Sequence, residues 1–191
     1  MYVVGVDPGT RIVGYGIVDM SRGKLTLVTC GVIDVRKKTN LPERLCKVFK
    51  KLTQILEKYK PDCVVVEKTF FAKNPDSAIK MGAGRGVALL AAALQNIPVS
   101  EYSATMIKKS VTGTGSAHKS QVQNMVKVIL GLKNVLKSTD VSDALSCAIC
   151  HCHRIGLLKS EEDSHSNIQC KAKLKSWRQA EQFVRGKGWI K

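Results

Sequence analysis

The strongest constraint in the sequence is an apolar run that ends abruptly at one carboxylate. Residues 3–6 read Val-Val-Gly-Val, Asp7 follows them, and Pro8 and Gly9 come next. A run that is apolar on both faces is typical of a central strand in a covered sheet, and the Pro-Gly pair cannot continue a strand ladder. The run therefore predicts a buried strand that brings Asp7 to the rim of a sheet. Taken alone, the acid would be interpreted as a turn cap.

The chain from the first turn to residue 67 adds strand and helix patterns. Alternating β-rich stretches over 13–18 and 25–33 predict that the first three strands form an antiparallel meander. A capping residue at Asn40, an early proline and apolar residues at helical spacing predict an amphipathic helix that ends at Lys60. Residues 62–67 predict a second buried strand, which also ends in a carboxylate, Glu67.

The rest of the chain, as far as residue 154, predicts one more strand and several further helices. Glycines at positions 82, 84 and 86 predict close packing of one helix backbone against the sheet. The predicted elements are a helix over 74–95, a strand over 98–102, a short helix containing Lys108, a helix over 120–130 and a last helix over 139–154. These patterns together predict a mixed α/β sheet.

Two more acids stand at the start of the last predicted helix. Asp140 and Asp143 are three residues apart, so they share a face, and both gain from the positive helix N-terminus. Such acids are common, and alone this pair would be structural. With Asp7 and Glu67, however, they predict one acidic cluster at a rim of the sheet. Clustered carboxylates repel one another unless a cation neutralises them, and hard oxygen ligands select Mg²⁺ or Mn²⁺.

The overall charge of the chain has the opposite sign to this cluster. The 191 residues contain 31 Lys and Arg against 15 Asp and Glu, a net charge of +16. Such an excess predicts a polyanionic partner, most often nucleic acid. A basic surface around an acidic pit favours metal-assisted cleavage of a phosphodiester, for which two ions about 4 Å apart are sufficient.

The cysteines and the hydropathy pattern indicate the compartment. The seven cysteines lie mainly in apolar segments, and no apolar leader opens the chain. This pattern predicts reduced thiols and a cytoplasmic location. No run approaches the ~20 apolar residues of a membrane span. Several cysteines and histidines between Cys147 and His153 suggest either a zinc site or a buried thiol face, and the second is favoured because successive helical residues face different ways.

A glycine-rich loop between Gly113 and Lys119 has lysines at both ends and suits a phosphate, with a mobile linker as the alternative. This loop is one of five blocks whose order and spacing resemble the RuvC family of bacterial Holliday-junction resolvases over residues 1 to about 153. The blocks are Val6-Asp7-Pro8-Gly9-Thr10-Arg11 with Gly14-Tyr15-Gly16, Val66-Glu67 with Phe70, Ala72, Lys73 and Asn74, Gly84-Arg85-Gly86-Val87-Ala88, Gly113 to Val122, and Asp140-x-x-Asp143-Ala144-Leu145.

The resemblance implies a fold, an activity and a set of partners. The fold would be ribonuclease-H-like, with a mixed five-stranded sheet and helices on both faces. The activity would be paired, symmetric hydrolysis of a four-way DNA junction by a homodimer that works with the RuvA and RuvB motor proteins. The resemblance also implies that two Mg²⁺ ions, for which Mn²⁺ can substitute, are held by Asp7, Glu67, Asp140 and Asp143.

The resemblance assigns DNA contacts to Phe70, Lys73, Lys108 and Lys119. Phe70 would replace base stacking that is lost when a junction opens, and the lysines would hold the phosphate backbone. From the residues alone, either member of the Phe70-Phe71 pair could be the exposed one, so the choice of Phe70 rests on the family. The tail over residues 155–191 lies outside the resemblance.

A basic tail follows the last predicted helix. Residues 155–191 are predicted to form a basic, partly ordered tail with a polar, turn-like stretch at 160–164. This tail could either bind nucleic acid or be a solvated extension.

Two other functions fit parts of the sequence. An ATPase of the actin and sugar-kinase class also begins with a strand ending in Asp-x-Gly-Thr, but the chain is too short for its two domains. A non-catalytic junction-binding protein is the second rival, and the presence of all four acids disfavours it.

Overall fold

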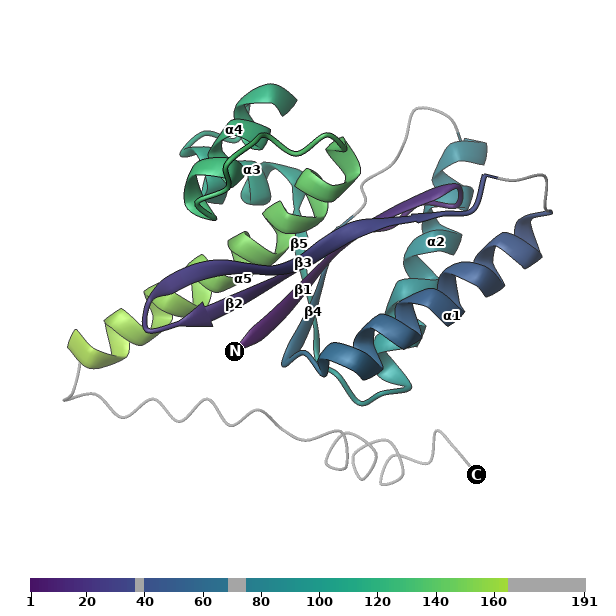
Figure 1. Ribbon diagram of the computed structural model, residues 1–191, viewed down its shortest axis with the longest axis horizontal. Helices are drawn as coiled ribbons and strands as arrows, with labels where there is room; N and C mark the ends of the chain where they lie inside the picture. Colours follow the sequence, from purple (N-terminus) through teal and green to yellow (C-terminus); the bar gives the residue numbers. More distant parts are fainter. Residues whose placement is uncertain (37–39, 69–74, 165–191) are drawn as a thin grey trace, which may run out of the picture. The chain divides into compact units, whose positions relative to one another are not determined.

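The structure is a computed structural model that describes residues 1–36, 40–68 and 75–164, with side-chain surroundings left out for 75–77 and 157–164. The chain divides into one unit from Met1 to Leu157 and a second from Leu158 to Lys191. The sheet and the packing described below belong to the first unit (Figure 1).

A mixed five-stranded sheet forms the centre of this unit, in the strand order β3-β2-β1-β4-β5. β1 and β3 each pair antiparallel with β2, which confirms the predicted meander, whereas β4 pairs parallel with both β1 and β5. The strands are β1 (Tyr2–Asp7), β2 (Ile12–Ser21), β3 (Lys24–Asp34), β4 (Cys63–Lys68) and β5 (Val99–Ser103). β1 is therefore central, as its apolar sequence predicted.

Two helices cover one face of the sheet. Helix α1 (Leu41–Tyr59) begins at Asn40, whose side chain accepts a hydrogen bond from the Glu43 N–H at 3.0 Å, as the capping pattern predicted. Helix α2 (Pro75–Ala93) packs beside α1. Both helices bury their apolar residues against the even-numbered positions of β1 and β4 and against Ile17 of β2. This core contains Val4, Val6, Ile17, Val64 and Val66 together with Val48, Leu52, Leu56, Ala88, Ala91 and Ala92.

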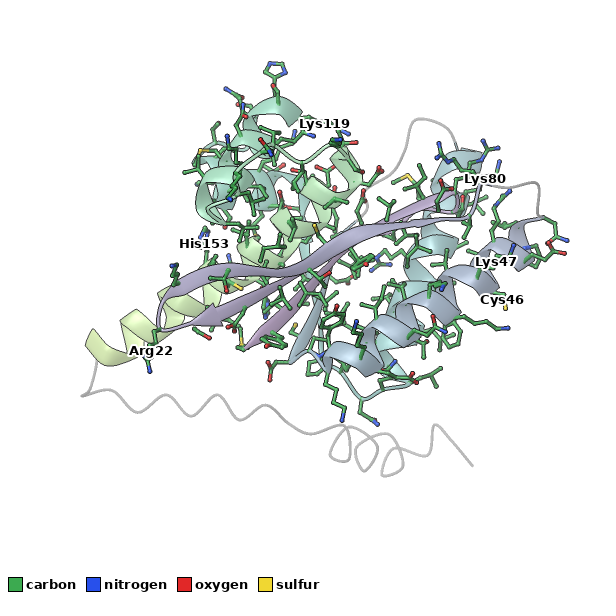
Figure 2. All side chains as sticks on the ribbon, viewed as in Figure 1. Arg22, Cys46, Lys47, Lys80, Lys119 and His153 are labelled. Atoms are coloured by element: carbon green, nitrogen blue, oxygen red, sulfur yellow. The ribbon has the colours of Figure 1, made fainter. Side chains whose placement is uncertain are left out.

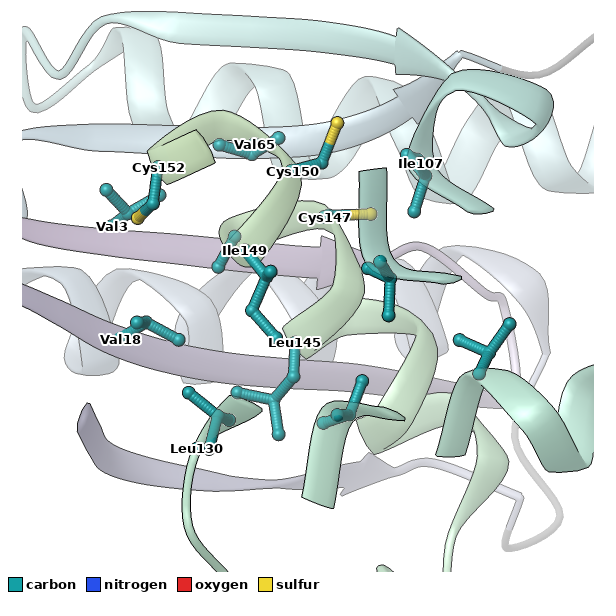
Figure 3. Packing of buried hydrophobic residues seen from close by; sticks show 14 of the residues in the cluster. Val3, Val18, Val65, Ile107, Leu130, Leu145, Cys147, Ile149, Cys150 and Cys152 are labelled. Carbon is teal, nitrogen blue, oxygen red and sulfur yellow. The ribbon is translucent and has the colours of Figure 1, made fainter. Parts of the chain in front are cut away.

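Three helices cover the opposite face. They are α3 (Ala104–Thr112), α4 (Lys119–Ile129) and α5 (Thr139–Ser164). Leu145, Cys147 and Ile149 on α5 belong to one buried cluster with Val3 and Val18 of the strands, and Figure 3 shows Cys152 of the same helix beside Val3. Because strand side chains alternate between faces, the odd-numbered residues of β1 and β4 point toward this second core. Helices therefore lie on both faces of a mixed sheet, as expected for the ribonuclease-H-like fold.

Glycines on β1 and β2 allow α5 to approach the sheet closely. Gly5 and Gly16 are cross-strand partners, and Gly14 is the partner of Asp7. A Cβ atom built on Gly5 would lie 1.8 Å from the carbonyl oxygen of Ala144, and one on Gly16 would lie 2.3 Å from Leu145 Cδ2. No side chain fits in these spaces, so the three glycines set the position of α5 on the sheet.

Two expectations about the helices are wrong in part. Of the three glycines in α2, only Gly84 packs closely, because its Cβ would lie 3.0 Å from the carbonyl oxygen of Gly9, whereas Gly82 and Gly86 face open space. Helix α5 continues through the stretch that was expected to be turn-like and ends at Ser164. The intervening Leu, Lys and Glu residues are good helix formers, and no proline or glycine interrupts them after Gly156.

The close approach of α5 predicts the effect of a single methyl group. The Gly5→Ala variant should lose about 1–3 kcal/mol or more in free energy of unfolding, because its Cβ meets backbone atoms that cannot rotate away. Urea denaturation followed by circular dichroism would measure this loss. Gly156→Ala is the matched control, because Gly156 lies in a helix with open space around it and should gain up to about 1 kcal/mol. Equal stability of Gly5→Ala and the parent protein would contradict the packing.

Candidate active site

The ends of β1 and β4 place Asp7 and Glu67 at the same edge of the sheet. Parallel pairing of the two strands runs from Val3 opposite Cys63 to Val6 opposite Val66, and each acid is the next residue along its strand. Both are odd-numbered, so both side chains point to the face covered by α5. The sheet register therefore puts two carboxylates on adjacent strands at one level.

The first turns of α5 add Asp140 and Asp143 to the same edge. Gly14 on β2 is the cross-strand partner of Asp7. Gly14 also lies against Asp140, because a Cβ atom built on it would be 2.1 Å from the Asp140 carbonyl oxygen. The Ser138 hydroxyl donates a hydrogen bond to Asp140 Oδ2 at 3.1 Å and holds this carboxylate at the start of the helix. The acids predicted from three separate stretches are thus near one another in the fold.

Burial and mutual repulsion perturb the acids strongly. The pKa of Asp7 is raised to about 7, mainly by burial and additionally by the negative charges of Asp143, Glu67 and Asp140, while Lys119 opposes them. Burial, followed by repulsion from Asp143, also raises the pKa of Glu67. The pKa of Asp143 is raised mainly by burial as well. Without a cation, Asp7 therefore holds a proton for part of the time at neutral pH.

Two lysines stand beside these acids. Lys119 Nζ lies 3.8 Å from Asp143 Oδ2, and Lys108 lowers the pKa of both Glu67 and Asp143. Lys119 is the first residue of α4 (Figure 2), where the positive helix terminus disfavours a cation. The position of Lys119 is thus unfavourable for the helix alone and suits an anion that both the lysine and the helix terminus can bind.

The four carboxylates fit divalent cations by their chemistry but do not form a finished cage. No three His, Cys, Asp or Glu side chains in the described parts of the chain are arranged closely enough to hold an ion. The donor atoms are nevertheless all hard carboxylate oxygens, which Mg²⁺ and Mn²⁺ prefer. Burial and the negative charge of the neighbouring carboxylates together favour a proton on Asp7. These four residues would hold a divalent cation, whose positive charge would take the place of this proton.

A cation that the sequence did not predict lies near the cluster. Arg36, just beyond β3, forms an ion pair with Asp34 at 2.6 Å, and its pKa is raised mainly by this partner and further by Asp140. The Asp34-x-Arg36 spacing at the end of a strand could have indicated an ion pair, but only the fold places Arg36 near Asp140.

Two of the predicted DNA contacts, Phe70 and Lys73, lie outside the described residues.

The cysteines near the end of the nuclease motifs form a buried face of α5. Cys147, Cys150 and Cys152 are at most 1% exposed, and burial raises the pKa of each thiol. The neighbouring histidines have other partners, since His151 Nδ1 lies 2.8 Å from the Tyr102 hydroxyl and His153 Nδ1 lies 3.2 Å from the Ser110 hydroxyl. The buried thiol face is confirmed.

The raised pKa of Asp7 predicts a pH-dependent stability. An acid whose pKa rises on folding stabilises the protein at low pH, and this contribution is lost as the pH rises toward and through 7. In chelator, Asp7→Asn should therefore melt about 2–6 °C above the parent protein at pH 8, with a smaller difference at pH 5. Differential scanning calorimetry would measure both. Glu57→Gln, at an exposed site on α1, should show no such trend, and a pH-independent difference for Asp7→Asn would contradict the assignment.

Comparison with known proteins agrees with this architecture. Residues 3–151 match the family profile described as crossover junction endodeoxyribonuclease RuvC. The chain is 45% identical over 157 residues to the protein of that name from Citrifermentans bemidjiense, covering 82% of this chain and 95% of the relative. The Thermus thermophilus RuvC structure superposes with a TM-score of 0.74 and 31% identity, covering 82% of this chain and 96% of that one.

A second structure of the Thermus protein, described as a complex with Holliday junction substrate, has a TM-score of 0.75 and 28% identity and covers the same 82% and 96%. Both the sequence and the fold are therefore shared along most of each chain, including the strands and the helix that bring the four acids together. The chain belongs to the RuvC family of crossover junction endodeoxyribonucleases.

Proposed function

We propose that this protein is an endonuclease that resolves four-way DNA junctions by paired, symmetric nicks during recombination and repair. The observation that carries the proposal is the meeting of Asp7, Glu67, Asp140 and Asp143 at one edge of the sheet, beside two lysines. The related Thermus protein has been solved with a Holliday junction substrate. A net charge of +16 suits a DNA partner of this kind.

Membership of this nuclease family implies dependence on divalent metal. We propose two Mg²⁺ ions per site, with Mn²⁺ as a substitute, held by the four carboxylates. When bound, such ions supply the Lewis acidity that activates an attacking water and stabilises the leaving oxygen, giving a 5′-phosphate and a 3′-hydroxyl. The all-oxygen donor set and the raised pKa of Asp7 among the other carboxylates support this assignment.

The side chains around the carboxylates have separate tasks in this proposal. Asp7 and Glu67 lie at the ends of β1 and β4, and the pairing of these two strands fixes their positions. Asp140 and Asp143 lie in the first turns of α5. Lys119 forms an ion pair with Asp143 in the free protein and lies at the N-terminus of α4. Its ammonium group can exchange this partner for a phosphate of the DNA. Lys108 shares this role from α3, so both lysines offset the charge of the transition state.

A cleavage assay on synthetic DNA tests the proposed activity. With Mg²⁺ the protein should nick a four-way junction symmetrically and leave a linear duplex of the same sequence intact, whereas chelator should abolish cutting. Asp7→Asn should bind the junction but cut it about 10²–10³-fold more slowly or worse. The control Asp62→Asn alters an acid at the opposite end of β4 and should cut normally. Tight binding without cleavage in any metal would instead support a non-catalytic junction-binding protein.

We also propose that the protein acts as a homodimer through helix α2. Ile79 and Leu90 on α2 and Leu94 just after it are 71%, 52% and 64% exposed, which is unusual for large apolar side chains. Gly82 and Gly86 leave open space on the same helix, so a second helix could approach closely. A helix that is apolar on several sides is normally buried, and a second copy of α2 would bury it.

The dimer proposal predicts the effect of charge on this helix. The double variant Leu90→Glu/Leu94→Glu should sediment as a monomer, because two buried charges would face each other across the interface. It should also lose paired nicking, since each monomer carries one site. Val128→Glu changes a side chain on α4 that is 69% exposed and should leave the oligomeric state unchanged. A double variant that sediments like the parent protein would exclude α2 as the interface.

The chain has a nuclease part and a basic C-terminal part in this proposal. We propose that residues 1–154 are the nuclease domain and that residues 155–191 are a basic tail, since the family match ends at residue 151. A protein truncated after residue 154 should then retain Mg²⁺-dependent cleavage.

We also propose a cytoplasmic location and cooperation with RuvA and RuvB. Co-purification of the protein with RuvA and RuvB on a junction would test the cooperation. No helix in the described segments has the length and apolarity that crossing a membrane demands.

A further inference from the structure

A groove with a volume of about 650 Å³ runs between helix α1 and the edge strand β3. It lies on the sheet face that carries α1 and α2, whereas Asp7 and Glu67 point to the face that carries α5. The groove is therefore separate from the carboxylate cluster. Three of its features, namely its rim, its floor and the strand beside it, indicate what it can bind.

The rim of the groove is a stripe of lysines along α1. Lys47, Lys50, Lys51 and Lys58 all line it and are all exposed (Figure 2 labels Lys47). Their spacing places them on one face of the helix, where like charges three and four residues apart repel one another. Asp34 also lines the groove, but it is paired with Arg36, and among the described residues no carboxylate forms an ion pair with Lys47, Lys50 or Lys51. The stripe therefore weakens the helix by itself and suits an external anion.

The floor of the groove is aromatic and apolar. Tyr15, Ile33, Ile55 and Tyr59 line it. Tyr15 lies across the edge strand, because a Cβ on Gly31 would be 2.9 Å from the Tyr15 hydroxyl oxygen. The glycine thus allows the ring to cover the backbone of β3. A surface of this kind can bury an aromatic or large aliphatic side chain between lysines whose stems are also apolar.

The strand beside the groove has an unprotected edge. β3 is 11 residues long and, within the described parts of the chain, pairs only with β2. No charged residue and no proline lies between Lys24 and Asp34, and Val32 is 46% exposed. Natural sheets usually block a long edge with charges or proline, because its free N–H and C=O groups otherwise pair with another strand.

We propose that this groove binds an extended acidic segment of a partner protein, which pairs with β3 as a sixth strand. The backbone of the segment would form hydrogen bonds with the free N–H and C=O groups of β3. Its acidic side chains would pair with the lysines of the rim, and an aromatic or large aliphatic side chain would pack on the apolar floor. The basic tail of this chain has the wrong charge to be the occupant. A DNA duplex would meet the lysines but would leave the tyrosines and the strand edge unused.

A peptide selection tests this proposal without relying on nuclease activity. A random library of 12-residue peptides, displayed on phage, would be selected against the full-length protein and against the triple variant Lys47→Glu/Lys50→Glu/Lys51→Glu. The expected result is enrichment of peptides in which acidic residues alternate with aromatic or large aliphatic ones. Their affinity should fall at least tenfold in the triple variant and remain unchanged in the control Lys127→Glu/Lys133→Glu/Lys137→Glu.

Two further measurements make the outcome decisive. Circular dichroism establishes that the triple variant, whose changes are all on exposed side chains, is folded. Hydrogen exchange with a selected peptide bound should show new protection of backbone amides within residues 25–33, as strand addition requires. Failure to enrich any acidic peptide, or equal binding to the triple variant, would overturn the proposal. Loss of junction affinity in the triple variant without acidic-peptide binding would overturn it too, and would make the groove a DNA surface.

Discussion

The close contact between α5 and the glycine-lined face of β1 and β2 is the constraint on which the rest of the site depends. Gly5 and Gly16 leave room for the helix backbone, and Gly14 brings Asp140 next to the strand that ends in Asp7. A side chain at any of these positions would move α5 away from the sheet. The acids on the helix would then separate from those on the strands, because helix and sheet are otherwise independent supports.

The same contact concentrates negative charge, and the protein tolerates this charge in the absence of metal by two means. Asp7 takes up a proton near neutral pH, and Lys119 forms an ion pair with Asp143. Both compensations are reversible. A divalent cation can replace the proton, and a phosphate can draw the lysine away, so the free protein is prepared for both ligands of the proposed reaction. The cluster is therefore a site that its ligands complete, which accords with the lack of a finished cage.

The two faces of the sheet serve different chemistry. The face under α5 carries the acids, buried thiols and the lysines of α3 and α4, whereas the face under α1 and α2 carries exposed apolar residues and a stripe of lysines. Strand alternation makes this separation possible, since neighbouring residues of one strand supply opposite faces. A small domain can thus combine the proposed catalytic edge with separate surfaces that we propose for self-association and for a partner.

Local patterns in the sequence determined the strands that end in Asp7 and Glu67, the capped start of α1 and the pairing of Asp140 with Asp143, because each depends on residues adjacent in the chain. The sequence also predicted a cluster, but only by combining four acids whose proximity it could not measure. Tertiary structure alone decided that Gly84 packs closely while Gly82 and Gly86 do not, that Arg36 lies near Asp140, and that lysines of α1 face the bare edge of β3. These outcomes depend on how helices sit against a sheet, and the distances that matter join residues far apart along the chain.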